Sequence, residues 1–283
     1  MDIGFIPYKT KKFVGTFFIH AIPIMIALLT IAPFIYVVII SFQHVIYLAG
    51  DPRLWISQPL TLSTYEHILT NTSMPRWMLN SLIVASAVTA IAIFIYSAAG
   101  YAFFRNRDKK SINILFGLVM IGIMVPKAVT MIPTFIMASN LHLTNTYIGL
   151  IIPPLAIPVG VFLVRQAMFS FPMELVDAAK IDGCSEISAF LRIVMPILAP
   201  TLVVVTIYTF MEQWREFVWP LILTTTDKSR TIPVGLSTFS SEFKTDYGIF
   251  MAGVVIAILP GIVMFLLFQR QFMKGMTAGA LKE

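Results

Sequence analysis

The chain has 283 residues, of which 58% are hydrophobic and only 12% are charged, and its mean hydropathy is +0.85. Soluble domains carry about 25% charged residues, so this composition excludes an ordinary soluble protein and indicates one that crosses a membrane several times. The formal net charge of +6 is distributed as membrane topology requires rather than as a nucleic-acid-binding surface, so we expect no nucleic acid among the partners.

Six stretches are apolar enough to span a bilayer, which takes about 20 mostly apolar residues. In chain order they are residues 17–42, 81–104, 112–138, 147–164, 197–223 and 249–268. The first is too long for the core of a signal peptide and no cleavage site of small residues follows it, so we interpret it as a retained span. The sequence therefore predicts an all-α membrane protein with six transmembrane helices in a single domain, residues 1–283.

The segments between these stretches alternate in charge. Lysine and arginine are in excess before residue 17, in residues 105–110 and after residue 269, whereas residues 139–146 carry no charge and residues 224–248 carry balanced charges. Cytoplasmic loops of membrane proteins are enriched in lysine and arginine. Both termini are therefore expected in the cytoplasm, and six spans place the loop before residue 197 there as well.

That loop, over residues 172–192, is a polar segment between two apolar ones. Pro172 suits the first turn of a helix, and Glu174 would lie near the positive end of that helix, where a carboxylate is favoured. The positions that share one face at spacings of three and four are Leu175, Ala178, Ala179 and Asp182. The two alanines make this face small, so another surface can approach it closely.

The second half of the loop predicts a turn and another short helix. Asp182 and Gly183 form a turn signal, and residues 185–191 favour a second helix before Pro196. The loop is thus expected to be a compact helix–turn–helix presented to the cytoplasm for docking. The alternative is a helix lying on the membrane surface, which is usually rich in lysine and arginine, whereas here the carboxylates outnumber the cations.

The loop also resembles the coupling loop of binding-protein-dependent ABC import permeases, and the resemblance extends from about Asn80 to the end of the chain. Other segments resemble stations of the carbohydrate-uptake branch, most of all the second permease subunit of maltose-type importers. They are Asn80-Ser81, Gly100-Tyr101-Ala102-Phe103 with Arg105, Pro126, Pro133, residues 143–147 with Gly149-Leu150, Phe162-Leu163 with Arg165-Gln166, Pro172-x-Glu174-Leu175, Trp219-Pro220-Leu221, Thr231-x-Pro233-x-Gly235-Leu236, Gln269-Arg270 and residues 277–282.

The chain departs from the family pattern at two places. Asp177 stands before Ala178-Ala179 where the family usually has glutamate, which keeps the carboxylate and the small face. Arg215 stands where the family usually has asparagine, between Trp214 and Glu216. Replacing an amide with a cation alters what this position binds, so the sugar specificity of the family is not carried over to this chain.

The resemblance implies a type I ABC importer permease in the bacterial or archaeal cytoplasmic membrane, surrounded by lipid. Its implied partners are a homologous permease forming a heterodimer, two ATP-binding subunits and an extracytoplasmic solute-binding protein, and its implied solute is a small carbohydrate. The chain lacks the Gly-x-x-x-x-Gly-Lys phosphate cradle, so ATP and Mg²⁺ are expected in the partner ATPase, with no cofactor, metal or catalytic residue in this chain.

The resemblance also assigns roles to particular segments. Residues 275–283 correspond to an extension that reaches the ATPases, and residues 224–248 to the segment that probes the binding protein. Coupling to the ATPase is assigned to Glu174, Asp177, Ala178, Ala179, Asp182 and Gly183.

The candidate solute pathway rests on polar residues within the spans, because charges there are costly and usually face protein or water. Pro126 and Pro133 flank one such charge, Lys127, and we expect a functional kink there, since a proline inside a helix removes a backbone hydrogen bond. The candidate pathway residues are Asn80, Lys127, Glu212, Trp214, Arg215 and Glu216. For two of them the sequence also allows a structural role: Asn80 could form hydrogen bonds between helices, and Trp214 could anchor the helix at the membrane interface.

Three alternatives compete with a sugar importer. The same architecture with an anionic solute, such as a glycerophosphodiester, would suit Arg215. A secondary transporter would show inverted repeats and buried acidic ion sites, neither of which is evident. An intramembrane enzyme would need paired carboxylates within spans, metal-ligand spacing or a nucleophile–base pair; none is found, and the one cysteine, Cys184, and four scattered histidines offer no metal site.

Overall fold

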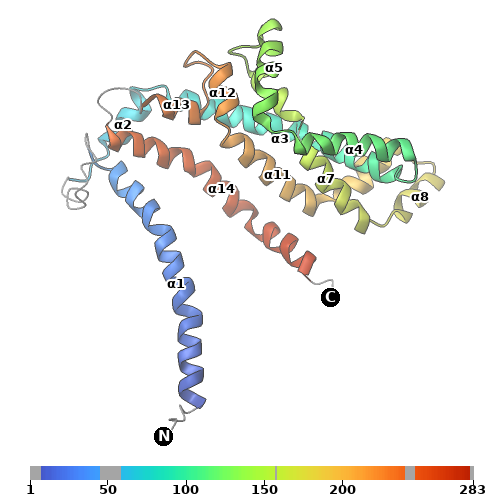
Figure 1. Cartoon of the computed structure of the whole chain (residues 1–283), viewed down its shortest axis with the longest axis horizontal. Coiled ribbons are helices and arrows are strands. Elements are labelled where there is room, and N and C mark those ends of the chain that lie inside the picture. Colours follow the sequence, from blue (N-terminus) through green and yellow to red (C-terminus); the bar gives the residue numbers. More distant parts are fainter. Residues whose placement is uncertain (1–7, 45–58, 157, 240–245, 281–283) are drawn as a thin grey trace. The chain divides into compact units, whose positions relative to one another are not determined.

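The computed structural model describes residues 8–44, 59–156, 158–239 and 246–280, with residues 8–18 and 270–280 described only as backbone. Within these ranges the chain forms helices joined by turns and loops, and contains no strand (Figure 1). Two compact units can be distinguished: residues 1–72 with 239–256, and residues 73–238 with 257–283. The expectation of one domain over residues 1–283 stays a prediction.

The first unit contains α1 (Tyr8–Ser41), α2 (Ser63–Thr70) and the beginning of α14 (Tyr247–Ala280). Most apolar side chains of α1 from Ile19 onward are exposed, as expected of a helix that faces lipid. Several side-chain hydrogen bonds form just after the end of α1. His44 lies between Asp246, 3.2 Å from Nδ1, and the Ser63 hydroxyl, 2.7 Å from Nε2, so side chains tie the segment after α1 to α2 and to the start of α14.

The second unit is built around α3 (Met74–Arg105), which packs against α7 (Pro158–Ala167) and α11 (Ala199–Trp214). Two glycines allow α3 and α7 to approach closely. A Cβ on Gly160 would lie 2.1 Å from the ring of Tyr96, and one on Gly100 would lie 2.7 Å from the side chain of Val164. The buried core along this contact includes Ala92, Val161, Met168, Leu202 and Val205.

The remaining helices of the second unit are shorter. They are α4 (Lys110–Met124), α5 (Lys127–Asn140), α6 (Tyr147–Ile151), the 3₁₀ turns η2 (Pro153–Leu155) and η3 (Met168–Ser170), α8 (Glu174–Ile181), α9 (Glu186–Ala189), the π-helical turn η4 (Phe190–Val194), α10 (Met195–Ile197), α12 (Val218–Leu223) and α13 (Ile232–Phe239). The last part of α14 also belongs to this unit.

Within the part of the chain that the structure describes, three helices are individually long and apolar enough to cross a membrane, namely Ile19–Ser41 of α1, α3 and Tyr247–Gln269 of α14. Counting each sharply bent pair of helices as one span raises this number to six. The bent pairs are Lys110–Met124 with Lys127–Asn140 at 99°, Tyr147–Leu155 with Pro158–Ser170 at 47°, and Glu186–Ile197 with Ala199–Trp214 at 80°. The third, fourth and fifth predicted stretches are therefore not continuous helices.

The sharpest bend coincides with the kink expected near Lys127. Val125 is extended, with φ −80° and ψ 116°, and Pro126 precedes the first residue of α5. A residue before proline is pushed out of the helical region by the proline ring, which is why the helix ends here. Pro133, by contrast, lies within α5.

The fifth predicted stretch, residues 197–223, divides for a different reason. Helix α11 ends at Trp214, and α12 begins at Val218. The carboxylate of Glu216 accepts hydrogen bonds from the backbone amides of Val218 and Trp219, at 3.1 and 3.3 Å. Because the first amides of a helix have no partner within it, this side chain stabilises the start of α12.

Candidate functional site

The polar loop, residues 172–192, folds as two short helices, and we refer to it as the hairpin. Its first helix, α8, begins at Glu174 rather than at Pro172, whose carbonyl accepts a hydrogen bond from the amide of Leu175 at 3.2 Å. Glu174 and Asp177 both occupy the first turn, where the helix dipole favours negative charge. The predicted helix is thus present, and it starts two residues later than expected.

The turn of the hairpin depends on Gly183. Its φ is +85°, a conformation that glycine adopts without the steric cost of a Cβ. The amide of Gly183 bonds to the carbonyl of Lys180 at 3.0 Å, and the amide of Cys184 to that of Ala179 at 2.9 Å, which is the Schellman arrangement that ends helices. The turn predicted at Asp182-Gly183 is confirmed, and Ser185 caps α9 by accepting from the amide of Ser188.

Part of the hairpin is buried and part is exposed. Val176 and Ala189 are fully buried in the core of the second unit. Elsewhere on the hairpin three large apolar side chains are open, with Leu175 46%, Ile181 88% and Ile187 73% exposed. Ala178 beside them is also exposed. Exposed apolar groups rimmed by charged residues are typical of a surface that binds another protein.

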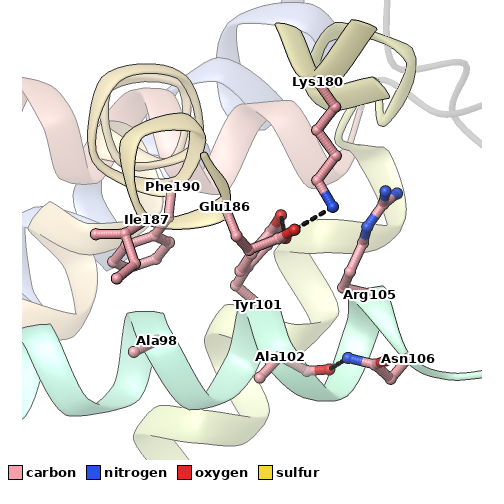
Figure 2. Close-up of a pocket in the computed structure, with 9 residues that line it drawn as sticks. All are labelled: Ala98, Tyr101, Ala102, Arg105, Asn106, Lys180, Glu186, Ile187 and Phe190. Carbon is pink, nitrogen blue, oxygen red and sulfur yellow. Dashed lines mark hydrogen bonds and ion pairs between the residues drawn. The ribbon is translucent and has the colours of Figure 1, made fainter. Parts of the chain in front are cut away.

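Polar side chains of α3 contact both helices of the hairpin. Arg105 donates from Nη2 to Oδ1 of Asp177 at 2.6 Å, and the hydroxyl of Tyr101 donates to the carboxylate of Glu186. Glu186 also forms an ion pair with Lys180. Figure 2 shows Tyr101, Lys180 and Glu186 directed toward one another at a cavity of about 510 Å³. This cavity is lined by Ala98, Tyr101, Ala102, Arg105, Asn106, Lys180, Glu186, Ile187 and Phe190.

The six residues assigned to ATPase coupling therefore divide by environment. Glu174, Asp182 and Ala178 are exposed on the hairpin, as is Gly183 in its turn. Ala179 is half-buried, and Asp177 binds Arg105 of α3. The sequence did not single out Tyr101 and Arg105 as partners of the hairpin, nor Glu186 as the hairpin residue that binds Tyr101. The available signal was the motif that contains Tyr101 and Arg105 four residues apart, a spacing that puts both on one helix face.

Four of the candidate pathway residues form a second polar cluster, which we call the charge cluster. Its members are Lys127 at the start of α5 and Glu212, Arg215 and Glu216 around the end of α11. Lys127 Nζ lies 3.3 Å from Glu212 Oε1 and 3.7 Å from Glu216 Oε2, and Arg215 pairs with Glu212. The two carboxylate side chains are about one fifth exposed, whereas both cationic side chains are more than 60% exposed.

Trp214 does not join the charge cluster. Its ring is buried, stacks on Phe210 with ring centroids 5.8 Å apart, and donates from Nε1 to the carbonyl of Ala257 at 3.0 Å. A sugar can stack only on an indole face that is exposed, and with 7% of Trp214 exposed, burial removes that option. The structure therefore favours a packing role for Trp214 between α11 and α14, a role that the sequence did not predict.

Asn80 is also buried, at the other end of α3 from the hairpin. Its side-chain amide donates to the carbonyls of Lys228 and Arg230 at 2.9 and 2.8 Å, and its oxygen accepts from the hydroxyl of Tyr147 at 2.6 Å. The geometry thus favours the role in bonding between elements over solute contact. Both N–H donors of Asn80 are used to fix the segment before α13.

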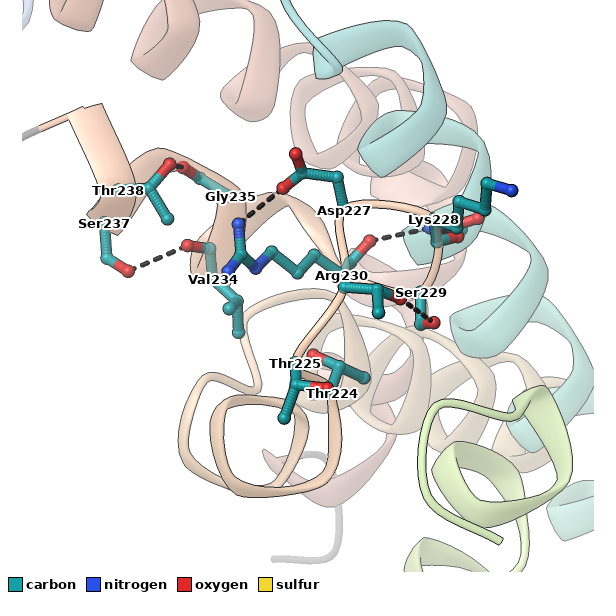
Figure 3. Close-up of polar contacts among 12 residues, drawn as sticks. Thr224, Thr225, Asp227, Lys228, Ser229, Arg230, Val234, Gly235, Ser237 and Thr238 are labelled. Atoms are coloured by element: carbon teal, nitrogen blue, oxygen red, sulfur yellow. Dashed lines mark hydrogen bonds and ion pairs between the residues drawn. The ribbon is translucent and has the colours of Figure 1, made fainter.

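That segment, residues 224–231, is further ordered by its own polar contacts. Asn145, in a left-handed conformation with φ 58°, accepts from the amides of Thr225 and Thr226 at 2.8 and 3.2 Å. Arg230 pairs with Asp227, and the Thr226 and Ser229 hydroxyls lie 3.0 Å apart; Figure 3 shows Arg230 directed at Asp227. The segment is a defined structure on the side of unit two opposite the hairpin.

The described residues thus combine bent pairs of apolar helices, a polar hairpin and a partly covered charge cluster. Residues 96–277 match the family described as "Binding-protein-dependent transport system inner membrane component". The chain belongs to this family, and it is accordingly a multi-pass protein of the inner membrane.

Individual relatives agree with the family match. The chain is 34% identical to the arabinooligosaccharides transport system permease protein AraQ of Halalkalibacterium halodurans, with 91% of this chain and 93% of the relative covered. It is 32% identical to the trehalose/maltose transport system permease protein MalG of Thermococcus litoralis, over 92% and 94% of the two chains.

A solved structure agrees in fold. A chain in the crystal structure of a bacterial ABC transporter involved in the import of the acidic polysaccharide alginate superposes with a TM-score of 0.81, covering 94% of this chain and 99% of that chain at 17% identity. The all-α fold expected from the sequence, that of a type I ABC importer permease, is thereby confirmed.

Proposed function

We propose that this chain is one permease subunit of an ATP-driven, binding-protein-dependent importer for a sugar or oligosaccharide. It would form half of the translocation pathway beside a homologous permease, while two ATP-binding subunits bind ATP and Mg²⁺ and hydrolyse the ATP. The names of the relatives, which refer to transport of arabinooligosaccharides and of trehalose and maltose, support the carbohydrate class.

The observation that carries the coupling role is the exposed apolar surface of the hairpin. Leu175, Ile181 and Ile187 remain exposed although Val176 and Ala189 of the same hairpin are fully buried. Apolar side chains held out of the protein core gain stability when a partner covers them. Ala178 lies among them and leaves room for close approach, while Glu174 and Asp182 offer carboxylates at the edge. We infer that the ATPase subunit docks on this surface.

The charge cluster supports an uncharged solute rather than an anion. Lys127 lies within 4 Å of two carboxylates, and Arg215 pairs with one of them. Two cations and two carboxylates leave no net positive charge to attract an anionic solute. The argument from Arg215 alone for a glycerophosphodiester is thereby weakened, and the exposed ends of Lys127 and Arg215 are instead suited to donate hydrogen bonds to sugar hydroxyls.

Solute-stimulated ATP hydrolysis by the reconstituted complex tests the proposal. In the wild-type complex, ATP hydrolysis is expected to be faster when the solute-binding protein is supplied with oligosaccharides than when it is supplied with glycerophosphodiesters. Ala178→Trp should reduce this stimulation about tenfold or more, as expected for a clash at the centre of an interface. Ala178 is exposed, so the variant should still fold and insert.

Asp108→Trp provides the matched control, because Asp108 is exposed in the loop between α3 and α4 and lies outside the hairpin. It should keep the wild-type stimulation. Uptake that continues after ATP is depleted would overturn the ATP-driven importer, and stimulation only by an anionic solute would overturn the carbohydrate assignment.

A further inference from the structure

The hairpin is attached to α3 by two polar side chains of that helix. Tyr101 and Arg105 lie four residues apart and therefore on one face of α3. Arg105 reaches Asp177 on α8, and Tyr101 reaches Glu186 on α9. A single face of one helix thus holds both helices of the hairpin.

A further ion pair closes this set of contacts. Lys180 of α8 binds the same carboxylate of Glu186 that Tyr101 binds, so the two hairpin helices are joined to each other as well as to α3 (Figure 2). The contacts form a closed path: Arg105 binds Asp177 of α8, Lys180 at the other end of α8 binds Glu186 of α9, and Glu186 binds Tyr101 of α3. Rotation of the hairpin about its contact with α3 would break at least one of these bonds.

Apolar packing holds the hairpin in place independently of these bonds. Phe190 is buried against the ring of Tyr101, with centroids 5.6 Å apart, and Val176 and Ala189 have no exposed surface. Apolar burial is non-directional, so it keeps the hairpin on α3 without fixing its angle. Hydrogen bonds between charged groups are directional and strong. The polar contacts are therefore the ones suited to set the orientation.

We infer that Tyr101 and Arg105 are positioning residues that fix the orientation of the hairpin on α3, so that a displacement of the hairpin moves α3 with it. This inference rests on the proposed function, because it assigns the route by which movement of the docked ATPase enters the permease. Neither residue contacts solute or ATP in this role. Each acts through a carboxylate of the hairpin.

Two variants remove the polar contacts and keep the packing. Tyr101→Phe deletes only the hydroxyl, and Arg105→Gln removes the charge. In the reconstituted complex, each is expected to lower the solute imported per ATP hydrolysed by about threefold or more, the order expected when one partly exposed charged hydrogen bond is lost. Arg107→Gln is the matched control, because the guanidinium of Arg107 donates to the carbonyl of Phe104 and lies over its ring rather than binding the hairpin.

A charge exchange separates positioning from a general loss of structure. Arg105→Asp alone should lower the import per ATP, and combining it with Asp177→Arg should recover most of the loss, because the ion pair is restored with its partners reversed. An equal defect in the single and double variants would contradict the inference.

Amide hydrogen exchange of residues 174–191 in the assembled complex supplies a readout that needs no solute. Tyr101→Phe and Arg105→Gln should raise the exchange rate of these amides about threefold or more relative to wild type and Arg107→Gln. Unchanged exchange in both would overturn the inference even if wild type imports sugar. Faster exchange in both, combined with a wild type that imports no sugar, would uphold the positioning role and overturn the proposed function.

Discussion

Gly183 shows how one residue sets the shape of the hairpin. Its φ of +85° is costly for any residue with a Cβ, whereas nothing lies within 4 Å of where that Cβ would stand. Gly183→Ala is therefore expected to cost about 1 kcal/mol through backbone strain alone. Amide exchange at residues 174–191 should speed up about fivefold, which corresponds to that free energy.

Gly117→Ala is the appropriate comparison for this substitution. A Cβ at Gly117 also meets nothing within 4 Å, but this glycine lies within α4 and has no positive φ. Alanine there should leave exchange in the hairpin unchanged and favour the helix. If the two variants affected the hairpin equally, backbone strain at Gly183 would not be the reason for its place in the turn.

At the scale of single elements, the sequence predicted some features and missed others for physical reasons. The bend at Pro126 was predictable because proline acts on its immediate neighbour, and the turn at Gly183 because glycine acts through its own backbone. Such effects are local. The effects of proline and glycine on the backbone can be predicted from the sequence without knowing which residues lie nearby in space.

The missed features all depend on contacts between residues distant in the chain or on competition for backbone groups. Burial of Trp214 against α14 requires the carbonyl of Ala257. A bonding role for Asn80 was open from the sequence, but its partners, carbonyls about 150 positions away, were not predictable. The division of the fifth predicted stretch requires the carboxylate of Glu216 to turn back onto α12. The members of the charge cluster were predicted as candidate pathway residues. The pairing of Lys127 on α5 with Glu212 on α11, however, joins two helices that no spacing rule connects.

The contact between α3 and α7 leads to a prediction at the same scale. Gly160→Ala would place a Cβ 2.1 Å from the ring of Tyr96, which has only 1% of its surface exposed. Overpacking of this kind costs about 1–3 kcal/mol, so the thermal midpoint of the purified protein should fall. Gly117→Ala, in open space on α4, should not lower it.

A second substitution tests whether the ring is the cause. Tyr96→Ala removes the ring atoms that clash, so in the Gly160→Ala background it should cost less than it does alone. Residues in direct contact couple in this way, and distant ones do not. Purely additive losses would show that Gly160 is needed for another reason.

At the scale of the second compact unit, α3 connects two specialised ends. Its 32 residues correspond to a length of about 48 Å at 1.5 Å per residue. Tyr101 and Arg105 bind the hairpin near its end, and Asn80 binds the segment of residues 224–231 near its start. If residues 224–248 contact the binding protein, as the resemblance implies, one helix joins that contact to the ATPase-docking surface.

Asn80→Leu tests this connection, because it keeps a similar volume while depriving the carbonyls of Lys228 and Arg230 of their donor. A loosened segment must be ordered again when the binding protein docks, and this ordering weakens binding. The concentration of loaded binding protein that half-stimulates ATP hydrolysis should therefore rise about fivefold or more, as expected for an unsatisfied buried group. Asn113→Leu is the control, since Asn113 donates to the carbonyl of Arg107 near the other end of α3. An unchanged half-stimulating concentration in Asn80→Leu would show that the order of residues 224–231 is not used in docking, and the connection through α3 would then be purely structural.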